Sequence, residues 1–175
     1  MKRRSAADLD RLMRELGTDL ALDFPGPSGY WEDADLATAP TGDRLPRRRD
    51  VATVQALAAA DQLLVNRLKT RRGELAELGH PEYGSRLHEL IGEPNVERTR
   101  NLAKLHVLEA MRDEPRVEKV LDCRVSAPHV PPREVVRIEV ELLLVGEPQP
   151  RNLVVPFSFA GEGAGLALDV KGPGT

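Results

Sequence analysis

A proline separates a helical pattern from a strand pattern in the second half of the chain. Before it, apolar residues recur at the spacing of one face of an α-helix: Leu102, Leu105, Leu108 and Met111, with Ala103, Val107 and Ala110 beside them. Pro115 ends this pattern, because proline has no backbone N–H and disfavours helical geometry in the preceding residue. After it, apolar residues alternate with polar ones, as in a strand: Leu121, Cys123 and Val125. We therefore expect Glu114 and Arg116 to flank a rigid corner between a helix and a sheet.

Two interpretations of this corner stay open. In the first, the helix stops and its two flanking charges are solvated, as most charged side chains are. In the second, the sequence Glu114-Pro115-Arg116 locks the fold, or presents Arg116 to a carboxylate of a partner. Both interpretations place the two charges at the boundary between helix and sheet.

The composition limits the class of protein. With 175 residues, 41% of them apolar, the chain can form one domain with a core. The formal net charge of −3 argues against a nucleic-acid binder, which usually has a basic excess. The lone Cys123 allows no disulfide within the chain, which fits a reducing compartment. No stretch looks like a signal peptide or a membrane span, so we expect a cytoplasmic protein without membrane contact.

The first half of the chain predicts helices joined by irregular segments. A serine cap and an apolar stripe predict a short amphipathic helix over 5–16. Alternating apolar residues predict a short strand over 18–24. The longest helix is expected over 50–70, with Asp50 as its N-cap. We find no internal repeat in this half or elsewhere.

The second half predicts an antiparallel sheet. Apolar residues alternate with charged ones over 134–145, and a second strand returns over 151–159. Pro156 lacks the N–H that a central strand needs, which predicts an edge or a bulge there. A further short strand is predicted within 165–170. The fold class is therefore α+β: N-terminal and central helices packed on a C-terminal antiparallel sheet, with an edge available for strand addition.

Changes in composition divide the chain into three parts: an N-terminal helix (1–16), a main domain (17–160) and a glycine-rich tail (161–175). Within the main domain, the Pro- and Gly-rich segment 25–48 is expected to be an inserted loop. It contains Tyr30 and Trp31, and Trp31 either folds back as a lid on the core or anchors a partner.

A cluster of arginines near the end of this loop is either solvated or bound to a partner carboxylate or phosphate: Arg44, Arg47, Arg48 and Arg49. Residues for catalysis show no recognised arrangement, since phosphate-loop, metal-ligand and nucleophile-elbow spacings are missing. Glu74 and Glu82 are a weak carboxylate pair, because a chain with 28 acidic residues always offers one. We expect no metal, no cofactor and no enzymatic activity.

Four short segments follow one another along the chain: Gly17-Thr18-Asp19, 68–75 (LKTRRGEL), 80–87 (HPEYGSRL) and Glu114-Pro115-Arg116-Val117. Together they resemble the baseplate wedge, or sheath-initiator, family of contractile tails. That family includes phage baseplate wedge proteins, a type VI secretion baseplate component and counterparts in extracellular contractile injection systems. The resemblance covers roughly residues 15–160, and the Glu-Pro-Arg corner is the family's hallmark.

The resemblance implies a structural protein that bridges the wedge core to the tube and templates sheath polymerisation inside a phage-tail-like particle. Its partners would be other wedge proteins, the first ring of sheath subunits and inner tube or hub proteins, without nucleic acid, in multiple copies (about six by the symmetry of such assemblies). Its sheet would accept sheath strands. Partner-binding residues are then expected in the corner, the strands and the loop: Glu114, Pro115, Arg116, Val136, Ile138, Val155, Phe157, Tyr30 and Trp31.

Two other classes stay open as alternatives. Members of the family are sometimes labelled lysozyme-like, which implies a cell-wall glycoside hydrolase with two carboxylates in a cleft, one of them with a raised pKa. A nucleic-acid adaptor acting through the arginine cluster would bind in a strongly salt-dependent way. The loop 25–48 and the N-terminal helix depart from the family's pattern.

Overall fold

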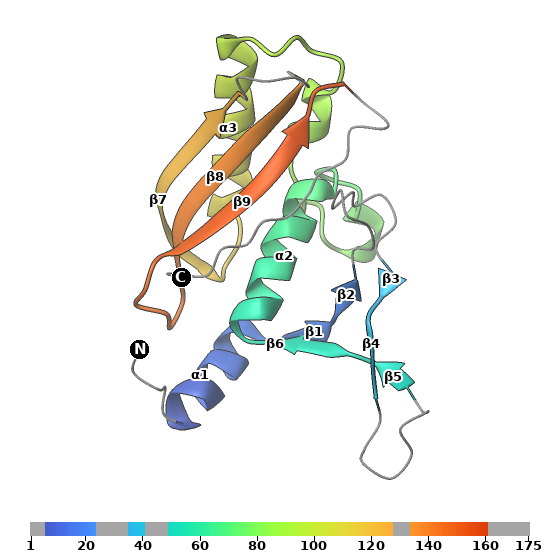
Figure 1. Cartoon of the computed structure of the whole chain (residues 1–175), viewed down its shortest axis with the longest axis vertical. Helices are drawn as coiled ribbons and strands as arrows, with labels where there is room; N and C mark the ends of the chain where they lie inside the picture. Colours follow the sequence, from blue (N-terminus) through green and yellow to red (C-terminus); the bar gives the residue numbers. More distant parts are fainter. Residues whose placement is uncertain (1–5, 24–34, 41–48, 128–133, 161–175) are drawn as a thin grey trace.

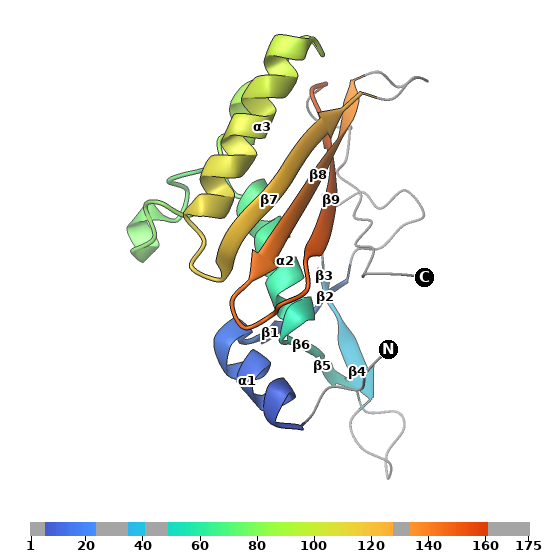
Figure 2. The ribbon, with the colours of Figure 1, turned by 90° about the vertical axis from the view of Figure 1, so that its left-hand side faces the viewer.

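The computed structural model describes residues 6–23, 35–40, 49–127 and 134–160. Within these residues, a three-stranded antiparallel sheet packs against α-helices (Figures 1 and 2). Helix α3 runs along the face of the sheet beside its first strand, and α2 lies closer to its third strand (Figure 1). Helix α1 lies below the sheet, and the helices span Ala6–Leu16 (α1), Leu57–Lys69 (α2) and Glu97–Arg112 (α3). The class is α+β, as the sequence predicted, and the helix predicted over 5–16 is confirmed over its described part, Ala6–Leu16.

The sheet is a meander in the order β7-β8-β9, with strands at Val117–Ser126, Val135–Leu144 and Arg151–Ser158. In the central strand β8, every second residue from Val136 to Leu144 is fully buried, so one face of the strand lies in the core. These residues share one core with apolar residues of α2 and α3, among them Leu64 and Val107. Both strands predicted for this part of the chain are confirmed, whereas 161–175 lies outside the described residues.

Helix α3 buries only part of the apolar stripe that the sequence predicted. Leu102 and Leu105 were expected in the core, but they are 36% and 47% exposed. The buried face consists mainly of smaller residues: Thr99, Ala103, His106, Val107, Ala110 and Met111. Small side chains let the helix approach the sheet closely, so the predicted period is confirmed, but only one side of the predicted stripe faces the core.

The helix predicted over 50–70 is also shorter, because α2 begins only at Leu57. The preceding residues form two short strands, β5 (Arg49–Val51) and β6 (Thr53–Gln55), so Asp50 is not a helix cap. β-Branched residues are frequent in this segment and pair with strands far away in the sequence, which outweighs the helical periodicity. With 13 residues, α2 is shorter than α3, which has 16.

Six short strands form three antiparallel ladders that meet at one point. β1 pairs with β6, β2 with β3, and β4 with β5, where the first four strands span Thr18–Leu20, Leu22–Asp23, Asp35–Leu36 and Thr38–Pro40. Three alanines close a ring of backbone hydrogen bonds between the ladders. Ala21 N–H donates to Ala52 O (2.9 Å), Ala52 N–H to Ala37 O (2.8 Å) and Ala37 N–H to Ala21 O (2.8 Å). We call this arrangement the three-ladder junction.

The junction corrects two predictions from the sequence. Each of its three segments carries an acidic residue, a branched apolar residue and an alanine: Asp19-Leu20-Ala21, Asp35-Leu36-Ala37 and Asp50-Val51-Ala52. This is a short internal repeat, which the sequence reading missed because it spans only three residues. The segment 25–48 is not one loop, since 35–40 forms β3 and β4. Residues 24–34 and 41–48, with Tyr30 and Trp31, lie outside the described residues.

One turn of α2 holds both the junction and the sheet. The side-chain amide of Gln62 donates to Leu20 O (2.8 Å) and accepts a hydrogen bond from Leu22 N–H (3.0 Å). Its neighbour Asp61 pairs with Arg151 of β9, with an Nε–Oδ1 distance of 3.2 Å. Of the helices that the structure describes, none is long and apolar enough to cross a membrane.

Candidate functional site

The helix–sheet corner is built around a buried carboxylate. Glu114 is only 2% exposed, and four N–H groups converge on its two oxygens. Oε2 is bound by Nε and Nη2 of Arg67, at 3.1 and 3.0 Å. Oε1 accepts hydrogen bonds from the backbone N–H and from Nη1 of Arg116, both at 3.2 Å. The carboxylate therefore fixes the corner through two guanidinium groups and one peptide group, and the interpretation that the corner is locked from within is confirmed.

Arg67 comes from the last turns of α2 and is itself buried, with 7% of its side chain exposed. Its guanidinium carbon lies 4.7 Å from the centre of the Tyr83 ring, which is close enough for a cation–π interaction. Its Nη1 has no hydrogen-bond partner among the described atoms. The Tyr83 ring and the Glu114 carboxylate thus stabilise the buried positive charge of Arg67, which burial alone would strongly disfavour.

Arg116 differs from Arg67 because 36% of its side chain is exposed. Its Nη2 lies beside Gly17, where an added Cβ would approach it to 3.9 Å. Arg116 also joins the corner to the sheet, since its carbonyl accepts the N–H of Val145 (3.0 Å). The corner arginine is therefore held by Glu114 on one side and reaches the surface on the other.

A tight loop over 70–85 packs beside the corner. Ser85 forms a parallel bridge with Arg71, and its hydroxyl donates to Leu68 O (2.5 Å). Gly84 has a φ of +105°, and a Cβ there would lie 2.7 Å from the backbone of Thr70 and Arg71. Only glycine adopts this positive φ without strain and leaves room for the neighbouring backbone. This approach explains why a glycine precedes the serine at this point of the sequence.

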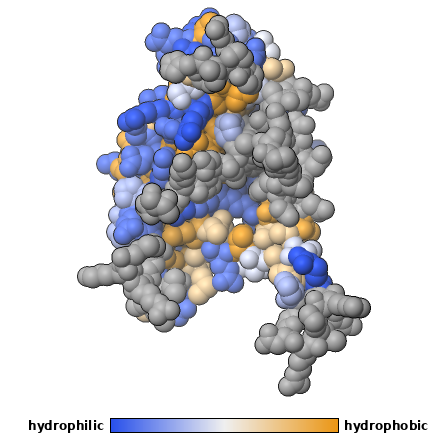
Figure 3. Space-filling view, viewed as in Figure 1, coloured by the Kyte–Doolittle hydropathy of each residue, from blue (hydrophilic) through white to orange (hydrophobic). Residues whose placement is uncertain are grey.

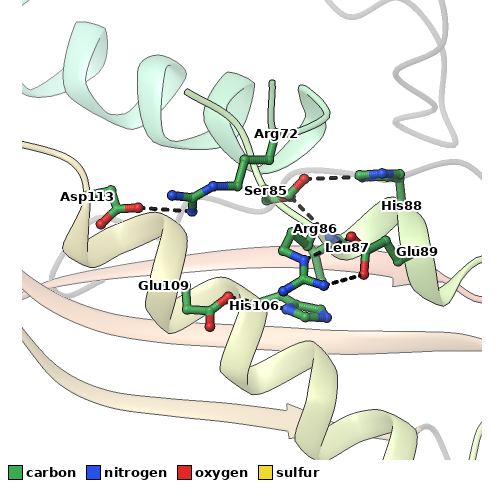
Figure 4. A network of polar contacts seen from close by, with 9 residues as sticks. All are labelled: Arg72, Ser85, Arg86, Leu87, His88, Glu89, His106, Glu109 and Asp113. Carbon is green, nitrogen blue, oxygen red and sulfur yellow. Dashed lines mark hydrogen bonds and ion pairs between the residues drawn. The ribbon is translucent and has the colours of Figure 1, made fainter. Parts of the chain in front are cut away.

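Figure 4 shows polar contacts of this loop, of the turn that follows it and of α3. Arg72 Nη1 donates to Asp113 just after α3 (3.0 Å; Figure 4). The same guanidinium pairs with Glu82. The 3₁₀ turns η1 (Ala76–Leu78) and η2 (Leu87–Leu90) flank the connection. The four segments that carry the family resemblance thus meet: Gly17-Thr18-Asp19, 68–75, 80–87 and Glu114-Pro115-Arg116-Val117. They form one interlocked structural unit around Glu114.

The charged groups of this unit pair with one another and stabilise the fold. Both oxygens of Glu114 are occupied by arginines of the same chain, so it offers no free carboxylate to a substrate. Glu82 is 73% exposed and pairs with Arg72, while Glu74 is exposed and accepts the N–H of Arg71 (3.0 Å). An acid catalyst in a glycosidase needs a desolvated site, which neither position provides. No cluster of three potential metal ligands occurs among the described residues.

Four residues predicted to bind partners lie inside the protein. Val136 and Ile138 are fully buried, and Val155 and Phe157 are 1% and 5% exposed. Their side chains pack in the core under the helices, so they hold the sheet together and present no surface. Partner binding at these positions stays a prediction, although their backbone groups are used within the sheet as well: Val136 and Ile138 lie in the central strand β8, and Val155 and Phe157 form bonded pairs with it. Pro115 is exposed at the corner.

The outer edge of β9 offers other backbone groups, which β8 does not use. Phe159 N–H donates to Glu134 O (3.0 Å), so these two residues form a hydrogen-bonded pair. Bonded and non-bonded pairs then alternate along β8 and β9. Asn152, Val154 and Pro156 fall in non-bonded pairs, so their backbone groups point away from β8. The prediction that Pro156 marks an edge is confirmed, because its missing N–H would face outward. No described strand pairs with this side of β9.

The opposite edge of the sheet is built differently. β7 has two register shifts, one between Val117 and Lys119 and one between Val120 and Asp122. Bulges of this kind twist an edge and interrupt its row of backbone groups, which discourages further pairing. The regular edge is therefore that of β9.

Sequence reasoning missed the residues that hold these elements. Arg67 falls within the helix predicted over 50–70, but nothing local marks it as the partner of Glu114, 47 residues away. Gln62 and Asp61 face the junction and the sheet from one helix turn, and they too lack a sequence signal. One hint was available in the sequence: Arg67 lies among apolar residues of its helix. A charged side chain in that position is expected to be buried and to have a hydrogen-bond or ion-pair partner.

No family model matches the chain. No curated protein matches it either. Among solved structures, the chain is similar to a crystal structure of a Geobacter sulfurreducens protein described as a "putative tail lysozyme", with a TM-score of 0.52 and 25% identity. The match covers 64% of this chain and 100% of that chain. This similarity suggests a phage-tail-related fold and a tail-associated role.

Proposed function

We propose that this protein is a structural component of the baseplate of a contractile tail or injection system. In this role it bridges the wedge core to the tube, and its sheet templates sheath polymerisation by accepting a strand. It has no enzymatic activity in this proposal. Its partners are other wedge proteins, the first ring of sheath subunits and the inner tube or hub, in multiple copies per particle.

The observation that carries the proposal is the regular edge of β9. Its outward backbone groups belong to a sheet whose other edge is interrupted by bulges and whose inner face is sealed by the core. Strand addition uses such an edge, because backbone hydrogen bonds give affinity and alternate side chains give register. The interlocked corner supports the proposal as well, since a template has to keep its shape under load. The tail-related neighbour agrees with the setting.

The test removes one outward N–H from the edge. Asn152→Pro deletes a donor that β8 does not use, so the sheet stays intact, while Asn152→Ala keeps the donor and serves as the control. Particles from strains carrying each variant are counted by negative-stain electron microscopy. We expect sheathed particles to be lost or reduced with Asn152→Pro and normal with Asn152→Ala. Equal numbers of sheathed particles with both variants would contradict templating at this edge.

A second candidate is cell-wall glycoside hydrolysis, which the description of the structural neighbour favours. It predicts clearing of a cell-wall suspension by the purified protein. Glu74→Gln and Glu82→Gln would have to abolish that clearing, because they remove the carboxylates considered for it. Absence of clearing by the wild-type protein eliminates this candidate.

A further inference from the structure

The three-ladder junction has an approximate threefold symmetry that determines which side chains share a face. The ring bonds lead from Ala21 to Ala52, from Ala52 to Ala37 and back to Ala21. In each ladder, the residue before one ring alanine pairs with the residue after another ring alanine. These pairs are Leu20 with Thr53, Val51 with Thr38 and Leu36 with Leu22. The residue before each ring alanine therefore occupies an equivalent position.

These equivalent residues are apolar and exposed. Leu20, Leu36 and Val51 are 48%, 43% and 41% exposed, which makes them three of the nine exposed large apolar side chains of the described chain. Strand alternation adds cross-strand neighbours on the same face. Figure 3 shows hydrophobic residues gathered over the meeting point of the ladders. We call this surface the junction face.

The charges of the junction are unequally divided between its two faces. By alternation, Asp19 and Asp50 fall on the side of the ring alanines, where Asp19 Oδ2 accepts a hydrogen bond from Gln62 of α2 (3.3 Å). The described residues of the junction face include one charged side chain, Arg49. Its Nε and Nη2 donate to the hydroxyl and carbonyl oxygens of Thr38, at 2.7 and 2.6 Å. A fixed guanidinium therefore stands at the rim of an apolar surface.

We propose that the junction face docks a partner protein whose contact surface is apolar and carries a carboxylate opposite Arg49. Three apolar side chains around one ring supply the centre of a small interface, and a fixed arginine at the rim supplies its orientation. A second copy of this chain is a poor occupant, because pairing two such faces would bring together two arginines without a carboxylate. This contact is separate from the edge of β9, so it does not depend on strand addition there.

The test uses the full-length protein in the cells that produce it, with a photo-crosslinking amino acid in place of Gln55. Gln55 is exposed and lies on the junction face, opposite Thr18. The probed variants are Leu20→Ser and Arg49→Glu. The matched control is Leu78→Ser, which makes the same change at a leucine that is 74% exposed in η1, away from the junction. Thermal unfolding of the purified variants checks that each remains folded.

We expect one crosslinked partner other than this chain, joined at an apolar segment that contains an Asp or Glu. The crosslinking yield should fall about tenfold with Leu20→Ser, as for a central interface residue. It should also fall with Arg49→Glu and recover when the partner's acid is changed to lysine, while Leu78→Ser leaves it unchanged. Crosslinks only between copies of this chain, an equal yield with Leu20→Ser and Leu78→Ser, or the lack of a discrete product would overturn the proposal.

Discussion

The helix–sheet corner and the three-ladder junction hold distant parts of the chain together by opposite means. The corner uses charged side chains, with Glu114 and Arg67 almost fully buried. The junction uses backbone hydrogen bonds between three alanines, and the apolar side chains around them are exposed. In the corner, each side chain is therefore part of the support. In the junction, the backbone gives support and most of the described side chains are exposed.

This difference predicts a large effect of breaking the corner. Glu114→Ala leaves the buried guanidinium of Arg67 without its carboxylate, which should cost about 3–5 kcal/mol of unfolding free energy. Urea denaturation followed by circular dichroism measures it. The double variant Arg67→Leu/Glu114→Leu removes both charges and should recover much of the loss. A single variant as stable as the wild type would show that the corner does not depend on this ion pair.

The loop beside the corner should be nearly as sensitive. Gly84→Ala forces a Cβ against the backbone of Thr70 and Arg71 at a φ of +105°. We expect a cost of about 1–3 kcal/mol or more. Gly92→Ala is the matched control, because its φ of +91° is similar and a Cβ there meets no atom within 4 Å. Equal melting temperatures for the two variants would mean that the close approach at Gly84 has no energetic weight.

The attachment of the junction to α2 should be weaker. Gln62→Ala removes the two hydrogen bonds to Leu20 and Leu22, at about 1 kcal/mol each. Hydrogen exchange should accelerate in the junction and remain slow in the sheet. Cys123 gives an independent check, because burial raises the pKa of its thiol to about 11 and keeps it protonated at neutral pH. Faster alkylation of Cys123 in this variant would mean that the junction and the sheet open together.

The smallest effect is expected on the junction face. Leu20→Ser changes a side chain that is 48% exposed, so the unfolding free energy should shift by no more than about 0.5 kcal/mol. Urea denaturation of this variant and of the wild type measures the shift. A loss of several kcal/mol would show that Leu20 belongs to the support of the junction and would remove the contrast with the corner.

The sequence predicted elements wherever local pattern and final structure agree. The alternation in β8, the proline at the corner and the edge position of Pro156 each follow from chemistry within a few residues. The start of α2 could not be predicted, because strand pairing with residues 18–20 decided it. The burial of Arg67 depends on a contact 47 residues away, and the ring of three alanines joins three separate strand segments, so periodicity carries no information about either.

The most direct test of the proposed function is an electron cryo-microscopy map of the assembled particle, with this chain placed by its sheet and its corner. We expect the chain in the baseplate below the first sheath ring, with a sheath strand paired antiparallel or parallel to the outer edge of β9. Particles that lack the chain, or that contain it with the edge of β9 unpaired by any sheath strand, would contradict the proposed role as a sheath template.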